Sequence, residues 1–166
     1  MSLASAGLHA DQIGIVVEDL DQAMRRYSRV FDCGSWSVWS YGPELFRESS
    51  FRGQEGRFSM RLALAGAGPQ IELIEPVQGP SLYHERLAEQ GEGLHHIGMR
   101  VPDLRAATRE MAERGFGVLQ SGRGYGLDGD GGFAYLDSVD SAAEMGVILE
   151  LIEVPARRRE PEAIVA

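Results

Sequence analysis

Four polar residues occupy matched places in two related parts of the sequence, and together they could bind a metal ion. The stretches QIGIVVEDL (12–20) and HIGMRVPDL (96–104) align without a gap, which sets His96 against Gln12. The stretches IELIE (71–75) and LELIE (149–153) match in the same way and set Glu150 against Glu72. An amide oxygen, an imidazole and two carboxylates are a suitable ligand set for a divalent transition ion, whose charge the two carboxylates would balance.

The residues around these glutamates predict that one acid of each segment is buried. Glu72 and Glu150 lie among isoleucine, leucine and valine, where a carboxylate is costly unless it is paired or bound to metal. Successive strand residues point to opposite faces, so the acids three positions later, Glu75 and Glu153, face the other way. The alternative is that all these acids are solvated residues at a sheet edge, but their repetition in both halves favours burial.

Each half of the chain repeats the same succession of elements. An apolar opening segment is followed by an aspartate, Asp19 or Asp103, that is suited to cap a helix. Helical periodicity then predicts helices over 20–31 and 104–116. The candidate strands lie at 13–17, 35–41, 57–65 and 71–75 in the first half, and at 97–101, 116–121, 132–137 and 149–153 in the second.

The repeat predicts an α+β fold built from two βαβββ modules. The first module is expected over residues 8–79 and the second over 93–154, with a helical connector over 80–92. The tail 155–166 has no periodicity and is expected to be mobile. The glycine-rich run 122–132 does not lie between a strand and a helix, so it predicts a loop and not a nucleotide-binding site.

Composition excludes several classes of function. The net charge of −9 argues against binding to nucleic acid or to an anionic membrane. All 16 basic residues are arginine, and without lysine the chain has neither a Schiff-base residue nor a P-loop. The single cysteine, Cys33, cannot form an intrachain disulfide or a thiolate-rich metal site. No apolar run is long enough to span a bilayer and the first residues do not form a signal peptide, so a cytoplasmic location is expected.

The sequence resembles the vicinal-oxygen-chelate superfamily, which includes glyoxalase I, methylmalonyl-CoA epimerase, extradiol dioxygenases and bleomycin-resistance proteins. The resemblance extends over about residues 8–154. It is carried by DQIGIVVEDLDQA (11–23), IELIEP (71–76), GEGLHHIGMRVPDL (91–104) and GVILELIE (146–153). The run GEGLHHIG, preceded by IELIEP, is most similar to the epimerase branch. The resemblance implies two modules paired in an open, cup-shaped mixed sheet around a metal ion.

Within that resemblance, the metal ligands are Gln12, Glu72, His96 and Glu150, one from each opening and closing strand. Nitrogen and oxygen ligands of this kind permit Co, Ni, Mn, Zn or Fe. Epimerases usually carry histidine where this chain has Gln12, although glutamine occurs there in some glyoxalase I enzymes. His9, three residues earlier, is a weaker candidate to replace that imidazole. His95 is expected to point away from the metal and to support the structure around it.

The implied reaction is proton transfer next to a carbonyl group, with a metal ion stabilising the enolate. Glu150 is one candidate for the base. Glu48 and Glu55 are others, since epimerases bring a second glutamate from this region. A 2-methyl-branched acyl-CoA thioester such as methylmalonyl-CoA is the expected substrate, and the resemblance suggests a homodimer.

Two other functions fit the same residues. A glyoxalase I-type lactoylglutathione lyase would suit the glutamine-containing ligand set. A non-catalytic protein of the bleomycin-resistance type would bind a small molecule in an apolar pocket, which Trp36, Trp39, Tyr41 and Phe46 could line, although these side chains could equally belong to the core. An extradiol dioxygenase is disfavoured, because its iron needs two histidines and a carboxylate.

Overall fold

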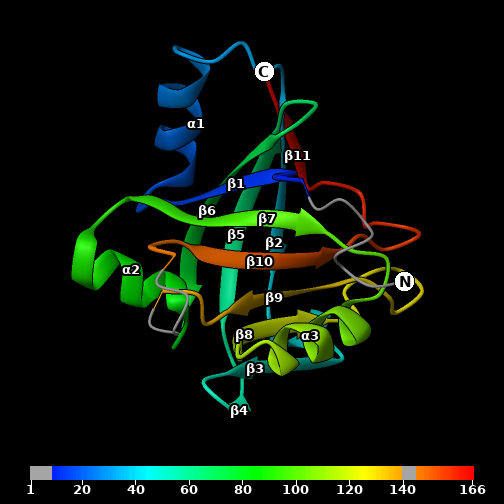
Figure 1. The fold of residues 1–166 in the computed structure, drawn as a ribbon. Helices are drawn as coiled ribbons and strands as arrows, with labels where there is room; N and C mark the ends of the chain where they lie inside the picture. Colours follow the sequence, from blue (N-terminus) through cyan, green and yellow to red (C-terminus); the bar gives the residue numbers. More distant parts are fainter. Residues whose placement is uncertain (1–8, 140–144) are drawn as a thin grey trace.

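A computed structural model describes residues 9–139 and 145–166, and within them the chain forms one mixed β-sheet with three α-helices (Figure 1). The sheet has eleven strands in the order β11-β2-β5-β6-β1-β7-β10-β9-β8-β3-β4. The α+β class predicted from the sequence is therefore confirmed. Residue 8, where the first module is predicted to begin, lies outside the described residues. None of the helices in the described ranges is long and apolar enough to cross a membrane.

Each half contributes four neighbouring strands and one helix. The first half supplies β1 (Gln12–Val16), α1 (Leu20–Ser28), β2 (Trp36–Tyr41), β5 (Ser59–Ala65) and β6 (Gln70–Gln78). The second half supplies β7 (Gly93–Arg100), α3 (Leu104–Glu113), β8 (Val118–Arg123), β9 (Gly132–Leu136) and β10 (Ile148–Glu153). The two halves join in the middle of the sheet, where β1 pairs with β7 in the antiparallel direction. Helix α2 (Leu82–Gln90) forms the connector between them.

The sheet is strongly curved, so that its two faces are packed differently. In Figure 1, β2 and β5 run upright while β7, β10 and β9 lie across the view. Helices α1 and α3 pack outside the curve, against the cores that contain Leu73 and Leu151. Residues on the other face, such as Leu62 and Phe133, gather in a third core inside the curve. The two-residue periodicity of the strands thus divides each strand between an outer core and an inner one.

Matched acids begin the two outer helices. The side chains of Asp19 and Asp103 accept hydrogen bonds from the backbone N–H groups of Gln22 and Ala106, which confirms both as N-caps. Glu75 accepts from the N–H of Leu20 at 3.0 Å. Glu153 accepts from the N–H of Leu104 at 2.8 Å. The second acid of each repeated segment therefore serves a helix start, whose free N–H groups favour negative charge.

Two parts of the sheet differ from the sequence-based expectation. Strands β3 (Glu48–Phe51) and β4 (Gln54–Glu55) form a hairpin of the first half that pairs with β8 of the second half. The tail 155–166, expected to be mobile, instead carries β11 (Ala163–Val165), which pairs with β2 at the opposite edge. The edge of β2 supplies hydrogen-bond partners that the tail's own sequence pattern does not reveal, and the mobility of the tail stays a prediction.

Candidate metal centre

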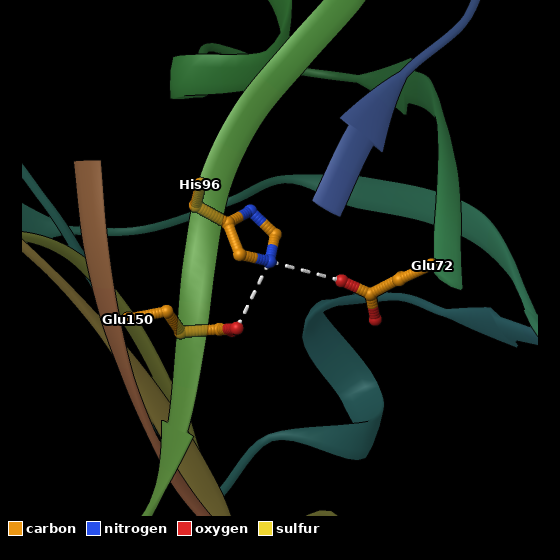
Figure 2. A group of neighbouring side chains, drawn as sticks. All are labelled: Glu72, His96 and Glu150. Atoms are coloured by element: carbon orange, nitrogen blue, oxygen red, sulfur yellow. Dashed lines mark ion pairs between the residues drawn. The ribbon is translucent and has the colours of Figure 1, made fainter. Parts of the chain in front are cut away.

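Three of the four predicted ligands converge on one point inside the sheet. Nε2 of His96 lies 3.0 Å from Oε2 of Glu150 and 3.3 Å from Oε2 of Glu72. The ligand atoms of the three residues all lie within 4.8 Å of one another, and Figure 2 shows Nε2 of the imidazole joined to both carboxylates. All three side chains are buried, and His96 is fully inaccessible to solvent. This is the arrangement of a site that could hold a metal ion.

The sheet order explains why residues so far apart in the sequence meet. Glu72, Gln12, His96 and Glu150 lie on β6, β1, β7 and β10, which are four consecutive strands in the middle of the sheet. Strand alternation puts Glu72 on the same face as Ile74, which belongs to the inner core. Each half therefore supplies one residue from its opening strand and one from its closing strand.

Two glycines make room for these side chains. Gly14 lies opposite His96 in the β1–β7 ladder, and a Cβ atom built there would be 1.8 Å from Cε1 of the imidazole. Gly98 lies opposite Gln12, and its Cβ atom would be 3.0 Å from both Cβ of Gln12 and Oε2 of Glu150. The glycine of each half thus stands across from the polar residue of the other half.

Gln12 lies beside the other three candidates. It is buried, and it lines the same cavity as Glu72 and Glu150. Its ladder partner Gly98 places it next to Glu150. Gln12 as an amide-oxygen ligand therefore remains a prediction that its position favours.

His95, expected to point away from the metal and to support the structure around it, is buried against the imidazole of His96. The ladder between β1 and β7 slips at this point: Gly14 pairs with His96 but Ile15 pairs with Leu94, which leaves His95 as the extra residue of a β-bulge. The two Nδ1 atoms of the histidines are consequently 2.9 Å apart.

The contact between the histidines can orient the imidazole of His96. Burial, and then the charges of His96 and Arg86, hold the pKa of His95 well below its ordinary value, which favours a neutral His95 whose Nδ1 can accept a hydrogen bond from Nδ1–H of His96. That arrangement leaves the lone pair of His96 Nε2 directed at Glu72 and Glu150. A hydrogen bond of this type fixes the tautomer of a metal-binding histidine.

The three buried ligand atoms are better suited to binding a cation than to forming hydrogen bonds with one another. Oε2 of Glu72, Nε2 of His96 and Oε2 of Glu150 have no hydrogen bond of acceptable geometry with any described residue, although they are within ion-pair distance. Buried polar atoms are normally satisfied. One imidazole nitrogen with two carboxylate oxygens is a common ligand combination for first-row transition ions and zinc. A divalent ion would satisfy all three atoms at once.

Without a cation, a proton serves in its place. Burial by itself lowers the pKa of His96, but the neighbouring carboxylates of Glu150 and Glu72 outweigh this effect and raise it to about 10. Burial raises the pKa of Glu150, while His96 opposes that rise. The imidazolium form of His96 thus balances part of the buried negative charge, and metal binding must displace its proton.

A cavity of about 620 Å³, including its open mouth, adjoins this centre. Glu72, Glu150 and Gln12 lie on its wall, and the remaining wall is largely aromatic and aliphatic. Of the four aromatic residues considered from the sequence, Tyr41 and Phe46 line the cavity. The other two are core residues, with Trp36 packed against the α1 side and Trp39 in the inner core.

The other candidate bases and the alternative histidine are not brought to the centre. Glu48 is exposed on β3 and forms an ion pair of 2.7 Å with Arg105. Glu55 is exposed at the sheet edge, and His9 is exposed as well. None of these three acids and histidines lines the cavity. The loop spacing in the sequence could not show that the hairpin carrying Glu48 crosses to the far edge of the sheet.

Sequence comparison matches this architecture to a known group. The sequence model of the Glyoxalase/Bleomycin resistance protein/Dioxygenase superfamily matches residues 11–135. A search of curated protein sequences gives no match.

Several solved structures share the fold. The chain is similar to a hypothetical protein from Bacillus halodurans C-125, with a TM-score of 0.65 and 21% identity, covering 93% of this chain and 99% of that one. It is similar to methylmalonyl-CoA epimerase from Mycobacterium tuberculosis, with a TM-score of 0.58 and 25% identity, covering 90% and 89%. A methylmalonyl-CoA epimerase in complex with methylmalonyl-CoA and NH4+ gives a TM-score of 0.57 and 22% identity, covering 91% and 97%.

Proposed function

Because the chain belongs to the Glyoxalase/Bleomycin resistance protein/Dioxygenase superfamily, we propose that it is a metal-dependent enzyme that transfers a proton next to a carbonyl group. The proposed reaction is epimerisation of a 2-methyl-branched acyl-CoA such as methylmalonyl-CoA. The observation that carries the proposal is the convergence of three buried ligand atoms beside a cavity. The epimerases among the similar structures support the choice of substrate.

Gln12, Glu72, His96 and Glu150 would hold the divalent ion, which we propose to be Co, Ni, Mn, Zn or Fe. Such an ion acts as a Lewis acid and stabilises negative charge that develops on a carbonyl oxygen. The chain itself fixes the ligands: β-strands position all four residues, and His95 holds the imidazole of His96. The largely apolar cavity wall keeps water away from the reacting carbon, which strengthens electrostatic effects there.

Glu150 is the proposed base that removes the α-proton. Its carboxylate faces the cavity, where it could meet the α-proton of a bound substrate. Glu72 comes from the other half of the sheet, and its carboxylate approaches the same Nε2 atom of His96 as Glu150 does (Figure 2). Since it projects from a different strand than Glu150, we propose that Glu72 returns a proton from the opposite face and so inverts the carbon. Glu48 has no part in this scheme, because it is exposed and paired with Arg105.

Proton exchange tests the proposal directly. Metal-reconstituted protein is incubated with methylmalonyl-CoA in D2O, and loss of the α-proton signal is followed by NMR. We expect exchange with the wild-type chain and none with Glu150→Gln, which keeps the shape of the side chain but loses both the proposed base and a proposed metal ligand. Glu153→Gln is the matched control, since Glu153 lies on the same strand but faces helix α3. Absence of exchange by metal-loaded wild-type protein would refute the epimerase assignment.

A glyoxalase-type lyase is the second candidate, and the position of Gln12 favours it, because the ligand set would then contain one amide, one imidazole and two carboxylates. The same protein preparation incubated with methylglyoxal and glutathione would form a thioester that absorbs in the ultraviolet. Activity there without α-proton exchange would select the lyase. Binding of small molecules with neither activity would select a non-catalytic protein. The proposed homodimer is checked separately by light scattering.

A further inference from the structure

The C-terminal segment forms part of the cavity wall. It is held at both ends: the N–H of Ala156 donates to Oδ2 of Asp130 at 2.7 Å, and the N–H of Glu162 donates to the carbonyl of Val38 at 2.8 Å. Between these points, Nε1 of Trp39 donates to the carbonyl of Arg159 at 2.9 Å. Figure 1 shows the end of the segment, β11, beside β2. The segment is thus positioned well enough to present a side chain to the cavity.

Three consecutive arginines in this segment have different surroundings. Arg157 is exposed and forms an ion pair with Asp128. Arg159 donates to the carbonyl of Tyr125 at 3.3 Å. Arg158, between them, lines the cavity that adjoins the metal centre. Of these three arginines, only Arg158 is among the residues that line the cavity.

Arg158 is held in place but is not neutralised. Its guanidinium lies 5.2 Å from the centre of the Trp39 ring, within range of a cation–π interaction. Its Nε atom is buried and has no hydrogen-bond partner among the described residues. Within the same residues, no carboxylate forms a salt bridge with it. Arg158 is half-buried on the cavity wall and has no carboxylate partner in the described part of the chain, so its guanidinium has donors available for a ligand.

With a divalent ion bound, positive charge would exceed negative charge on the cavity wall. The carboxylates of Glu72 and Glu150 would offset the ion, and the positive charges of Arg158 and Arg100 would remain on the wall. Arg100 donates to the amide oxygen of Gln70, which is uncharged. Tyr41 lines the same cavity, and burial raises its pKa, with a lowering effect of the Arg158 charge and a raising effect of Glu72. The cavity thus favours an anionic molecule that spans from the metal centre to Arg158.

From these observations we infer that Arg158 binds an oxyanion of the substrate and makes the cavity selective for anionic substrates. A guanidinium offers a planar pair of N–H donors that matches a carboxylate or a phosphate. In the proposed reaction the oxyanion is either the acyl carboxylate or a phosphate of the thioester carrier. The inference rests on the proposed function only in placing the substrate in this cavity.

Calorimetric titration with two simple probes tests the inference without using turnover. Methylmalonate represents the acyl carboxylate and inorganic phosphate represents the carrier. Arg158→Gln should weaken binding of at least one probe about 10-fold to 100-fold, as expected for the loss of a charge-assisted hydrogen bond. If only methylmalonate binds more weakly, Arg158 contacts the acyl carboxylate. If only phosphate binds more weakly, Arg158 contacts a phosphate of the carrier. Arg158→Lys should show a smaller loss, because it keeps the charge without the planar fork.

Arg157→Gln is the matched control, since it removes the same charge from the neighbouring position outside the cavity. It should bind both probes as the wild type does. The inference is overturned if wild-type protein binds neither probe, if Arg158→Gln binds both unchanged, or if Arg157→Gln loses as much affinity. Circular dichroism of each variant verifies folding. If Arg158→Gln does not fold, the affinities of Arg158→Lys for the two probes test the inference instead. Anion binding that depends on Arg158 in a protein without α-proton exchange would refute the epimerase proposal and leave this inference standing.

Discussion

Replacing Gly14 by alanine should expel the imidazole of His96 from the metal centre. The new Cβ atom would lie 1.8 Å from Cε1 and 2.2 Å from Nε2 of His96, whereas ordinary contact begins at 3.4 Å. The ring must therefore retreat by the difference, 3.4 − 1.8 = 1.6 Å. Ligands in a functional site must hold their positions to within about 0.5 Å. The alanine variant should consequently lose His96 as a ligand.

The size of the effect follows from two separate losses. Forcing an extra methyl group into a packed interior costs about 1–3 kcal/mol of folding free energy. Even residues that only support a ligand cost about 10-fold to 100-fold in metal affinity when they are changed. Since the Gly14→Ala change displaces the ligand itself, we expect Co²⁺ to bind at least about 100-fold more weakly.

Two measurements check this prediction. Calorimetric titration with Co²⁺ reports the metal affinity, and thermal unfolding of the metal-free protein reports the cost of crowding. Gly117→Ala is the control, because a Cβ atom at Gly117 would meet nothing within 4 Å. If Gly14→Ala bound Co²⁺ like the wild type, or unfolded at the same temperature as Gly117→Ala, the argument that this glycine makes room for His96 would be refuted.

Three further predictions concern the charges of the centre and the symmetry of the two halves. Glu72→Gln and Glu150→Gln should each abolish the metal content measured by elemental analysis, because each removes a negative charge that balances the ion. Full metal occupancy in either variant would exclude that residue as a ligand. In metal-free protein, the pKa of His96 is raised from 6.5 to about 10, so its stabilisation is complete below about pH 6.5 and is lost as the pH rises through about 10. The unfolding temperature should therefore fall toward pH 10, and His96→Gln should flatten this fall; an equal fall in the variant would contradict the assignment. Asp19→Ala and Asp103→Ala should each lower the free energy of unfolding by about 1 kcal/mol in urea titrations, since each removes an N-cap; no loss in either would show that its cap is not needed.

The part of the fold that the sequence predicts is the part that the repeat encodes. Asp19 and Asp103 are N-caps, and the predicted helices and the strands of the two βαβββ successions are present, with their ends shifted by a few residues. Glu72, His96 and Glu150 meet because the opening and closing strands of the two halves are four consecutive strands in the middle of the sheet. A repeated acid within an apolar strand was an informative signal, since burial of a lone carboxylate is costly.

The remaining features depend on contacts that leave little trace in the local sequence. The β-bulge at His95 arises from the register between β1 and β7 and not from the sequence of either strand alone. The hairpin that carries Glu48 pairs with β8 of the other half, and the sequence of its short strands does not predict this long-range pairing. The tail that carries Arg158 is ordered by hydrogen bonds to Val38 and Trp39. In each case the partner strand supplies the constraint.

The alternation of ligands and glycines explains why one half alone could not form this centre. Within each half, a polar residue stands two positions before a glycine, as Gln12 before Gly14 and His96 before Gly98. In the antiparallel β1–β7 pair these residues are exchanged, so that each polar side chain faces the other half's glycine and fits into the space it leaves. Two copies of one half paired in this way would place two glutamines or two histidines at the centre. Because Gln12 and His96 differ, the proposed ligand set, and with it the choice of metal, would be a property of the pair of halves and of neither half by itself.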